Sequence, residues 1–192
     1  RAPILLAGEG VQRSRAQGAF AELAHRLKCP VLTTLGGAGA FPETEAQWLR
    51  YMGKAGGEAI AASDLLLAVG TCLPETANYG RLQNFAVNDE GRQVILVEPD
   101  AAAVGVNRPV DLALIGQVDL VLAQLLEAVG DGSAFKEHAE LDKWRNASKA
   151  EDKALTDNLP RSNRLHPGHL MLEARRAVPE DAVIVVDGGL TM

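Results

Sequence analysis

Leu65-Leu66-Leu67-Ala68-Val69 is an apolar run that stops at Gly70, and runs of this kind decide the fold. The run does not alternate apolar with polar side chains, so both of its faces should be buried, as in a parallel sheet covered by helices. Four more runs end at a glycine or an acidic turn: Ile4-Leu5-Leu6-Ala7, Val31-Leu32-Thr33-Thr34, Val94-Ile95-Leu96-Val97 and Leu112-Ala113-Leu114-Ile115. We therefore expect an α/β fold: a Rossmann-like parallel sheet of five to six strands with helices on both faces.

Helical patterns lie between these runs. Apolar residues at helical spacing predict helices over Gln17–Leu27 and Val118–Val129, and a shorter one over Glu58–Ala62. Residues 71–88 have several turn formers and no clear period, which predicts an irregular loop.

The turns after the strands are the expected place for a ligand. In parallel sheets the loops at the carboxyl ends line the ligand crevice, and glycines there let a phosphate approach the backbone. Gly8-Glu9-Gly10 could open a dinucleotide fingerprint, but Arg13 stands where the third glycine belongs. A plain strand-to-helix turn is an equally good interpretation, so the pattern predicts a nucleotide-sized ligand or the relic of its site.

Composition excludes some classes of function. The chain has 192 residues, 47% of them hydrophobic, and a net charge of −6, which argues against a nucleic-acid partner. No apolar run approaches the roughly 20 residues that span a membrane. Cys29 and Cys72 have no second cysteine or histidine at metal spacing, so we expect reduced thiols and a cytoplasmic protein.

The chain divides into three parts. Residues 1–130 form the α/β domain, and residues 131–165 form a charged linker with a helix anchored by Trp144. Residues 166–192 restart the pattern with a helix to Ala177 and a strand over 182–186, the first step of a truncated domain.

Two motifs resemble metal sites but have simpler interpretations. Gly130-Asp131-Gly132-Ser133 follows a predicted helix rather than a buried strand, which indicates a helix C-terminal turn. His166 and His169 lack a third ligand nearby, which favours residues at the start of a helix.

Several segments, in order and in register, resemble the central domain of thiamine-diphosphate-dependent enzymes of the acetolactate synthase type. The segments are Pro3 to Ser14, Pro30 to Gly37, Ala62 to Thr71 and Asn107 to Asp111, and the tail from Leu165 to Gly189 resembles the opening of that family's diphosphate-binding domain. The resemblance implies a parent carboligase or decarboxylase of 2-oxo acids that uses thiamine diphosphate and Mg²⁺. It also implies that this chain, bound to the rest of its own polypeptide in a homodimer or homotetramer, is not catalytic by itself.

The family's crevice carries over residue by residue. The implied cofactor-binding residues are Gly8, Glu9, Gly10, Thr34, Gly36, Gly53, Gly56, Gly70, Thr71, Glu98, Asp100, Gly116, Gly189 and Thr191. No catalytic or metal-binding residue is expected.

The identity of the crevice ligand is open. Central domains of the family hold FAD, an ADP-like group or nothing. Lys54-Ala55 and Cys72-Leu73-Pro74 replace the residues usual in flavin-binding members, which argues against FAD. The alternative to an enzyme part is a free-standing NAD- or ADP-binding regulatory module.

Overall fold

A computed structural model describes residues 2–50, 53–73, 91–161 and 165–185. The chain forms two compact units, Arg1–Ser148 and Lys149–Met192.

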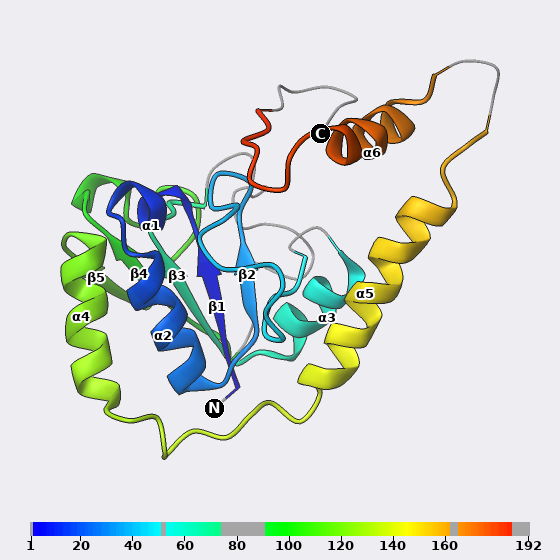
Figure 1. Ribbon diagram of the computed structural model, residues 1–192. Coiled ribbons are helices and arrows are strands. Elements are labelled where there is room, and N and C mark those ends of the chain that lie inside the picture. Colours follow the sequence, from blue (N-terminus) through cyan, green and yellow to red (C-terminus); the bar gives the residue numbers. More distant parts are fainter. Residues whose placement is uncertain (1, 51–52, 74–90, 162–164, 186–192) are drawn as a thin grey trace. The chain divides into compact units, whose positions relative to one another are not determined.

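The first unit is built on a five-stranded, all-parallel sheet in the order β2-β1-β3-β4-β5 (Figure 1). Its strands are β1 (Pro3–Ala7), β2 (Val31–Thr33), β3 (Leu65–Val69), β4 (Gln93–Glu98) and β5 (Leu112–Ile115). All five strands lie where the apolar runs predicted them, and the predicted α/β fold is confirmed.

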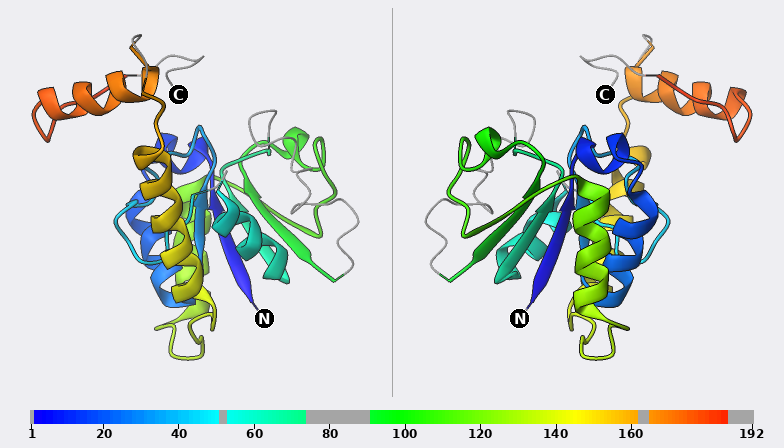
Figure 2. Two further views of the ribbon diagram at one scale, coloured as in Figure 1. Left: turned by 90° about the vertical axis from the view of Figure 1, so that its right-hand side faces the viewer. Right: turned by 90° about the vertical axis from the view of Figure 1, so that its left-hand side faces the viewer.

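Side chains alternate between two cores, one on each face of the sheet. Leu5, Ala7 and Val69 belong to the first core, together with residues of α2 (Gln17–Leu27) and α4 (Val118–Val129). Ile4 and Leu6 belong to the second core, on the face covered by α3 (Lys54–Ala62). Figure 2 shows helices on both sides of the sheet. A strand buried on both faces must be apolar at every position, which explains the absence of alternation in the sequence.

The helix predicted over Glu58–Ala62 begins earlier than expected, at Lys54. Gly56 and Gly57 suggest a turn in the sequence, yet both are buried in this helix. A Cβ on Gly56 would lie 2.2 Å from the carbonyl oxygen of Arg50 and 3.0 Å from Leu32 Cδ2. The glycine thus lets α3 pack closely on the segment beside it, and this contact outweighs the low helix propensity of glycine.

The charged segment forms α5 (Leu141–Asp157), as expected. Leu141 and Trp144 are only 2% and 1% exposed, and Trp144 belongs to the second core. Burial of an indole ring stabilises the first turns of a helix whose remaining surface is mostly charged. The loop predicted over 71–88 lies, from residue 74 on, outside the described residues.

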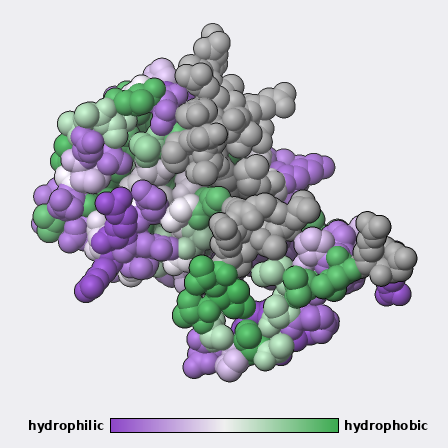
Figure 3. Space-filling model, turned by 90° about the horizontal axis from the view of Figure 1, so that it is seen from above, coloured by the Kyte–Doolittle hydropathy of each residue, from purple (hydrophilic) through white to green (hydrophobic). Residues whose placement is uncertain are grey.

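The second unit contains α6 (Pro167–Ala177) at the predicted position. The strand predicted over 182–186 is absent from its described part, because 182–185 pair with no other described strand. None of the described side chains of this unit is buried. Figure 3 shows apolar side chains at its surface, and Val183 and Val185 are 90% and 91% exposed.

No helix formed by the described residues combines the length and the apolarity needed to cross a membrane.

Candidate functional site

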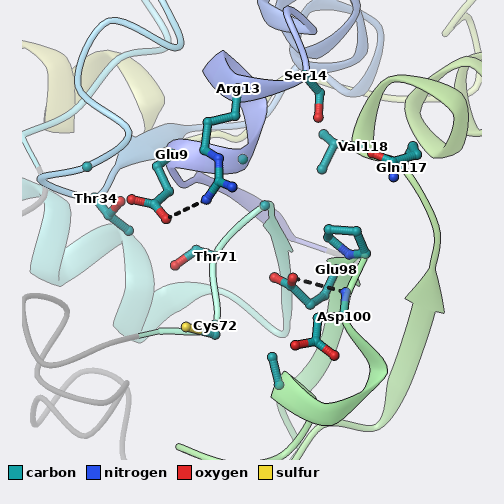
Figure 4. A pocket seen from close by; sticks show the side chains of 15 residues that line it. Glu9, Arg13, Ser14, Thr34, Thr71, Cys72, Glu98, Asp100, Gln117 and Val118 are labelled. Carbon is teal, nitrogen blue, oxygen red and sulfur yellow. Dashed lines mark hydrogen bonds and ion pairs between the residues drawn. The ribbon is translucent and has the colours of Figure 1, made fainter.

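A cavity of about 740 Å³ lies in the first unit, at the carboxyl edge of the sheet. Its walls come from the turns that follow β1 to β5 and from the first turns of α1 (Glu9–Arg13) and α4 (Figure 4). The lining residues are Glu9, Gly10, Arg13, Ser14, Thr34, Gly36, Gly70, Thr71, Cys72, Glu98, Pro99, Asp100, Ala103, Gln117 and Val118. Its size and position are typical of a site for a small ligand.

Carboxylates dominate the charged part of the lining. Arg13 Nη1 lies 3.4 Å from Glu9 Oε1, one helical turn away, and Figure 4 shows the two side chains pointing toward one another. Both side chains are largely exposed, so this ion pair is weak. On the opposite wall, Glu98 Oε1 accepts a hydrogen bond from the Asp100 backbone N–H at 3.3 Å. The described lining therefore carries three carboxylates and one guanidinium.

Asp100 also fixes the turn after β4. Its Oδ1 accepts a hydrogen bond of 2.8 Å from the backbone N–H of Ala102, which caps the short 3₁₀ helix Ala101–Ala103. An N-capping carboxylate satisfies a donor that the helix leaves unpaired. The position of Asp100 is therefore set by the backbone beneath it and does not depend on a ligand.

The glycines of the first turn serve a backbone crossing. A Cβ on Gly8 would lie 2.3 Å from the Gly70 carbonyl oxygen, and a Cβ on Gly10 would lie 2.7 Å from Gly70 Cα. The N–H groups of Gly8 and Gly10 donate to the carbonyls of Val69 and Gly70, each at 2.9 Å. The absence of side chains here lets two turns of the protein touch, which favours the plain strand-to-helix turn over a close approach of a phosphate.

Two threonines and a cysteine lie along the inner side of the cavity. Thr34 and Thr71 are 4% and 5% exposed, and their hydroxyl oxygens accept hydrogen bonds of 3.1 Å from the N–H groups of Gly37 and Leu73. Cys72 is half-buried and free of any disulfide. Burial raises the pKa of the Cys72 thiol, and the nearby Glu98 carboxylate raises it further. The thiol is therefore protonated at neutral pH and is a poor nucleophile.

The structure brings most of the implied cofactor-binding residues to this cavity. Eight of them line it: Glu9, Gly10, Thr34, Gly36, Gly70, Thr71, Glu98 and Asp100. Gly8 is buried beneath them in the crossing with Gly70. Gly189 and Thr191 lie outside the described residues.

Three more of the implied residues do not line the cavity. Gly53 is the N-cap of α3, and Gly56 is buried within that helix against the other face of the sheet. Gly116 lies beside the cavity, where a Cβ would come within 2.9 Å of Val121 Cγ2. The close packing of α4 on β5 therefore accounts for this glycine.

Sequence reasoning missed several lining residues: Arg13, Ser14, Cys72, Pro99, Ala103, Gln117 and Val118. Arg13 could have been found, because it stands four residues after Glu9 in a short helix and so shares its face. Gln117 precedes the predicted helix Val118–Val129, and an N-cap position faces the carboxyl edge of the sheet.

The two motifs that resemble metal sites have structural roles. Gly130 ends α4 with φ +67°, and Asp131 Oδ1 accepts a 2.9 Å hydrogen bond from the Ser133 N–H, which lowers the pKa of Asp131. His166 caps α6 by accepting a 3.1 Å hydrogen bond from the Gly168 N–H. Within the described ranges, no three His, Cys, Asp or Glu side chains gather to hold a metal ion. These residues therefore do not fit the Mg²⁺ that the family resemblance implies.

Comparison with known proteins points in one direction. The family model described as "Thiamine pyrophosphate enzyme, central domain" matches residues 1–125. The acetolactate synthase large subunit of Cyanidium caldarium is 32% identical over 192 residues, covering 97% of this chain and 32% of the relative. An acetolactate synthase of Mycobacterium avium is 39% identical over 131 residues, covering 66% of this chain and 20% of the relative.

A solved structure agrees with these sequence matches. An X-ray structure assigned to a thiamin diphosphate-dependent enzyme from Mycobacterium smegmatis aligns with a TM-score of 0.55 and 25% identity. The alignment covers 70% of this chain and 26% of the other. The chain thus spans a third or less of the length of these three proteins.

Proposed function

The chain belongs to the thiamine pyrophosphate enzyme family, as a central domain, and from this premise we propose that it works within a longer polypeptide. The activity proposed for that polypeptide is thiamine-diphosphate-dependent carboligation or decarboxylation of 2-oxo acids, as a transferase or lyase similar to acetolactate synthase. The observation that carries the proposal is the family match over residues 1–125, which covers all five strands of the parallel sheet. The acetolactate synthase relatives support this reaction class.

The chain alone is proposed to be inactive. Thiamine diphosphate supplies a stabilised carbanion when it is bound, and this chemistry needs a metal-held diphosphate. The described residues offer no metal site, and Asp131 is used in a helix-terminal turn. What this chain contributes to the longer polypeptide is the rigid sheet that holds the strand-end turns.

We retain the division into a central domain (1–130), a linker (131–165) and the start of a diphosphate-binding domain (166–192) as a proposal. The location of Trp144 in a core of the sheet favours close attachment of the first half of the linker. The lack of buried side chains among the described residues of 149–192 favours a segment that packs on further protein. A cytoplasmic location is likewise proposed.

A dimer or tetramer is the proposed assembly. Exposed Val183 and Val185 are candidates for a contact between copies, because burying each would stabilise association by about 1.5–3 kcal/mol. Deleting residues 165–192 should then shift the chain toward the monomer in light scattering. An unchanged mass would remove this segment from the interface.

The decisive experiment compares the chain with its parent polypeptide. Both proteins are incubated with pyruvate, thiamine diphosphate and Mg²⁺, and CO₂ release and acetolactate formation are measured. We expect turnover by the parent and a rate equal to the buffer blank for the 192-residue chain. Turnover by the chain alone, or a parent that does not consume any 2-oxo acid, would contradict the proposal.

A further inference from the structure

Five backbone donors around the cavity are already used within the protein. The N–H groups of Gly8, Gly70 and Gly116 donate to carbonyls near the ends of neighbouring strands, those of Val69, Val97 and Glu98, at 2.9, 2.9 and 3.2 Å. Thr34 N–H donates to Ala7 O at 2.9 Å, and Gly10 N–H to Gly70 O at 2.9 Å. These bonds continue the sheet ladder into the turns. A diphosphate is normally held by such N–H groups, and here each of these five is occupied.

The short helix of the first turn does not replace these donors. Helix α1 has five residues, ends at Arg13 and is followed by Arg15 with φ +52°. Its first turn presents the carboxylate of Glu9, whose Oε2 would lie 3.3 Å from a Cβ on Gly36. Glu9 therefore extends from the helix toward Gly36, at the wall of the cavity.

The charge of the lining opposes a phosphate as well. Glu9, Glu98 and Asp100 are carboxylates, and Arg13, the one cationic side chain among the described lining residues, lies beside Glu9. A diphosphate would bring further negative charge into this cavity. Carboxylates at strand ends, in contrast, accept hydrogen bonds from hydroxyl groups such as those of ribose.

We infer that this crevice excludes FAD and other diphosphate-bearing ligands and accepts a phosphate-free, hydroxyl-bearing molecule of nucleoside size. The inference rests on the proposed function, in which this unit is the central domain, and it names the ligand class of that domain's crevice. The cavity volume of about 740 Å³ accommodates such a ligand. Glu98 and Asp100 are the hydroxyl acceptors, and Glu9 is the group that repels a phosphate.

Binding of three probes to the 192-residue chain tests this inference. Adenosine, ADP and FAD are titrated by calorimetry at low ionic strength, where electrostatic effects are least screened. We expect adenosine to bind at least about tenfold more tightly than ADP, because a phosphate faces like charges across a partly desolvated site. We also expect the purified chain to carry no flavin absorbance after incubation with FAD and gel filtration.

Two variants separate the roles of the carboxylates. Glu9→Gln should reduce the ratio of the adenosine affinity to the ADP affinity. Glu98→Gln should weaken the binding of adenosine. Glu127→Gln, an exposed carboxylate of α4 outside the cavity, is the matched control and should change neither affinity.

Several results would overturn the inference. One is that ADP or FAD binds as tightly as adenosine. The others are a purified chain that is yellow with bound flavin, and an adenosine titration that shows no detectable binding. Failure of the proposed function is read separately, from 2-oxo acid turnover by the parent polypeptide, so the two conclusions stand or fall on different measurements.

Discussion

The crossing of the first and third strand-end turns can be tested by adding one methyl group, in Gly70→Ala. Gly70 has φ +62°, a conformation that costs a residue with a side chain about 1–2 kcal/mol. The new Cβ would also lie 2.7 Å from Gly10 Cα and 2.9 Å from Val11 N. Both atoms are backbone and cannot move aside as a flexible side chain can, so overpacking adds about 1–3 kcal/mol. We expect a total loss of about 2–5 kcal/mol in the free energy of unfolding.

Gly105→Ala is the matched control for this variant. Gly105 has a similar φ of +76°, yet a Cβ there would meet no atom within 4 Å. It should lose only the conformational part, about 1–2 kcal/mol. The reduced entropy of the unfolded chain is common to both variants and cancels in the comparison.

The assay is urea unfolding followed by circular dichroism, with stability taken from the midpoint at constant slope. The difference between the two variants isolates the packing term and should be about 1–3 kcal/mol. Equal losses would show that the turns do not touch as described, and the explanation of Gly8 and Gly10 as packing residues would fail with it.

Three further predictions concern helix anchoring, helix capping and the cavity thiol. Trp144→Ala should cost about 3–5 kcal/mol of unfolding free energy and speed hydrogen exchange in the first turns of α5, whereas Leu155→Ala, 60% exposed on the same helix, should stay within about 0.5 kcal/mol. Arg26→Met removes donors to the carbonyls of Leu126 (2.9 Å) and Gly130 at the end of α4, and it should lower the free energy of unfolding by about 1–3 kcal/mol. Lys153→Met, a change at an exposed ion pair, should leave the free energy of unfolding nearly unchanged. Because burial and Glu98 raise the pKa of Cys72, less of it is thiolate at any given pH, so alkylation by iodoacetamide should reach half its maximal rate above the usual pH of about 8.5. Glu98→Gln should lower that midpoint, Cys29 should stay unreactive in the folded chain, and a midpoint at or below the usual value would contradict the assignment.

The strands were predictable from sequence, and the start of α3 was not. A strand buried on both faces leaves an unbroken apolar run, and the five runs were sufficient to place β1 to β5. Lys54-Ala55-Gly56-Gly57 has the composition of a turn, and only the contact with the Arg50 carbonyl shows why these residues are helical. Local propensity is outweighed where tertiary packing rewards a missing side chain.

The same division holds for the cavity. Turn residues that follow a strand could be placed at the carboxyl edge, so Glu98 and Asp100 were found. The use of the Gly8 and Gly10 N–H groups could not be foreseen, because it depends on which strand lies beside β1. The described residues 182–185 of the predicted strand 182–186 are unpaired for a related reason. β-Branched residues favour an extended chain, but a strand exists only with a neighbour to receive its hydrogen bonds.

The backbone hydrogen bonds that continue from the sheet into the turns limit how this crevice can change in evolution. Because the turns after β1, β2, β3 and β5 are tied to the sheet through their own backbone, their paths are inherited with the fold. A new ligand preference must then arise from replacements at positions whose side chains face the cavity, such as Glu9, Arg13, Cys72 and Glu98. Single substitutions at these positions leave the frame intact, so related central domains can diverge in what they hold while keeping one architecture.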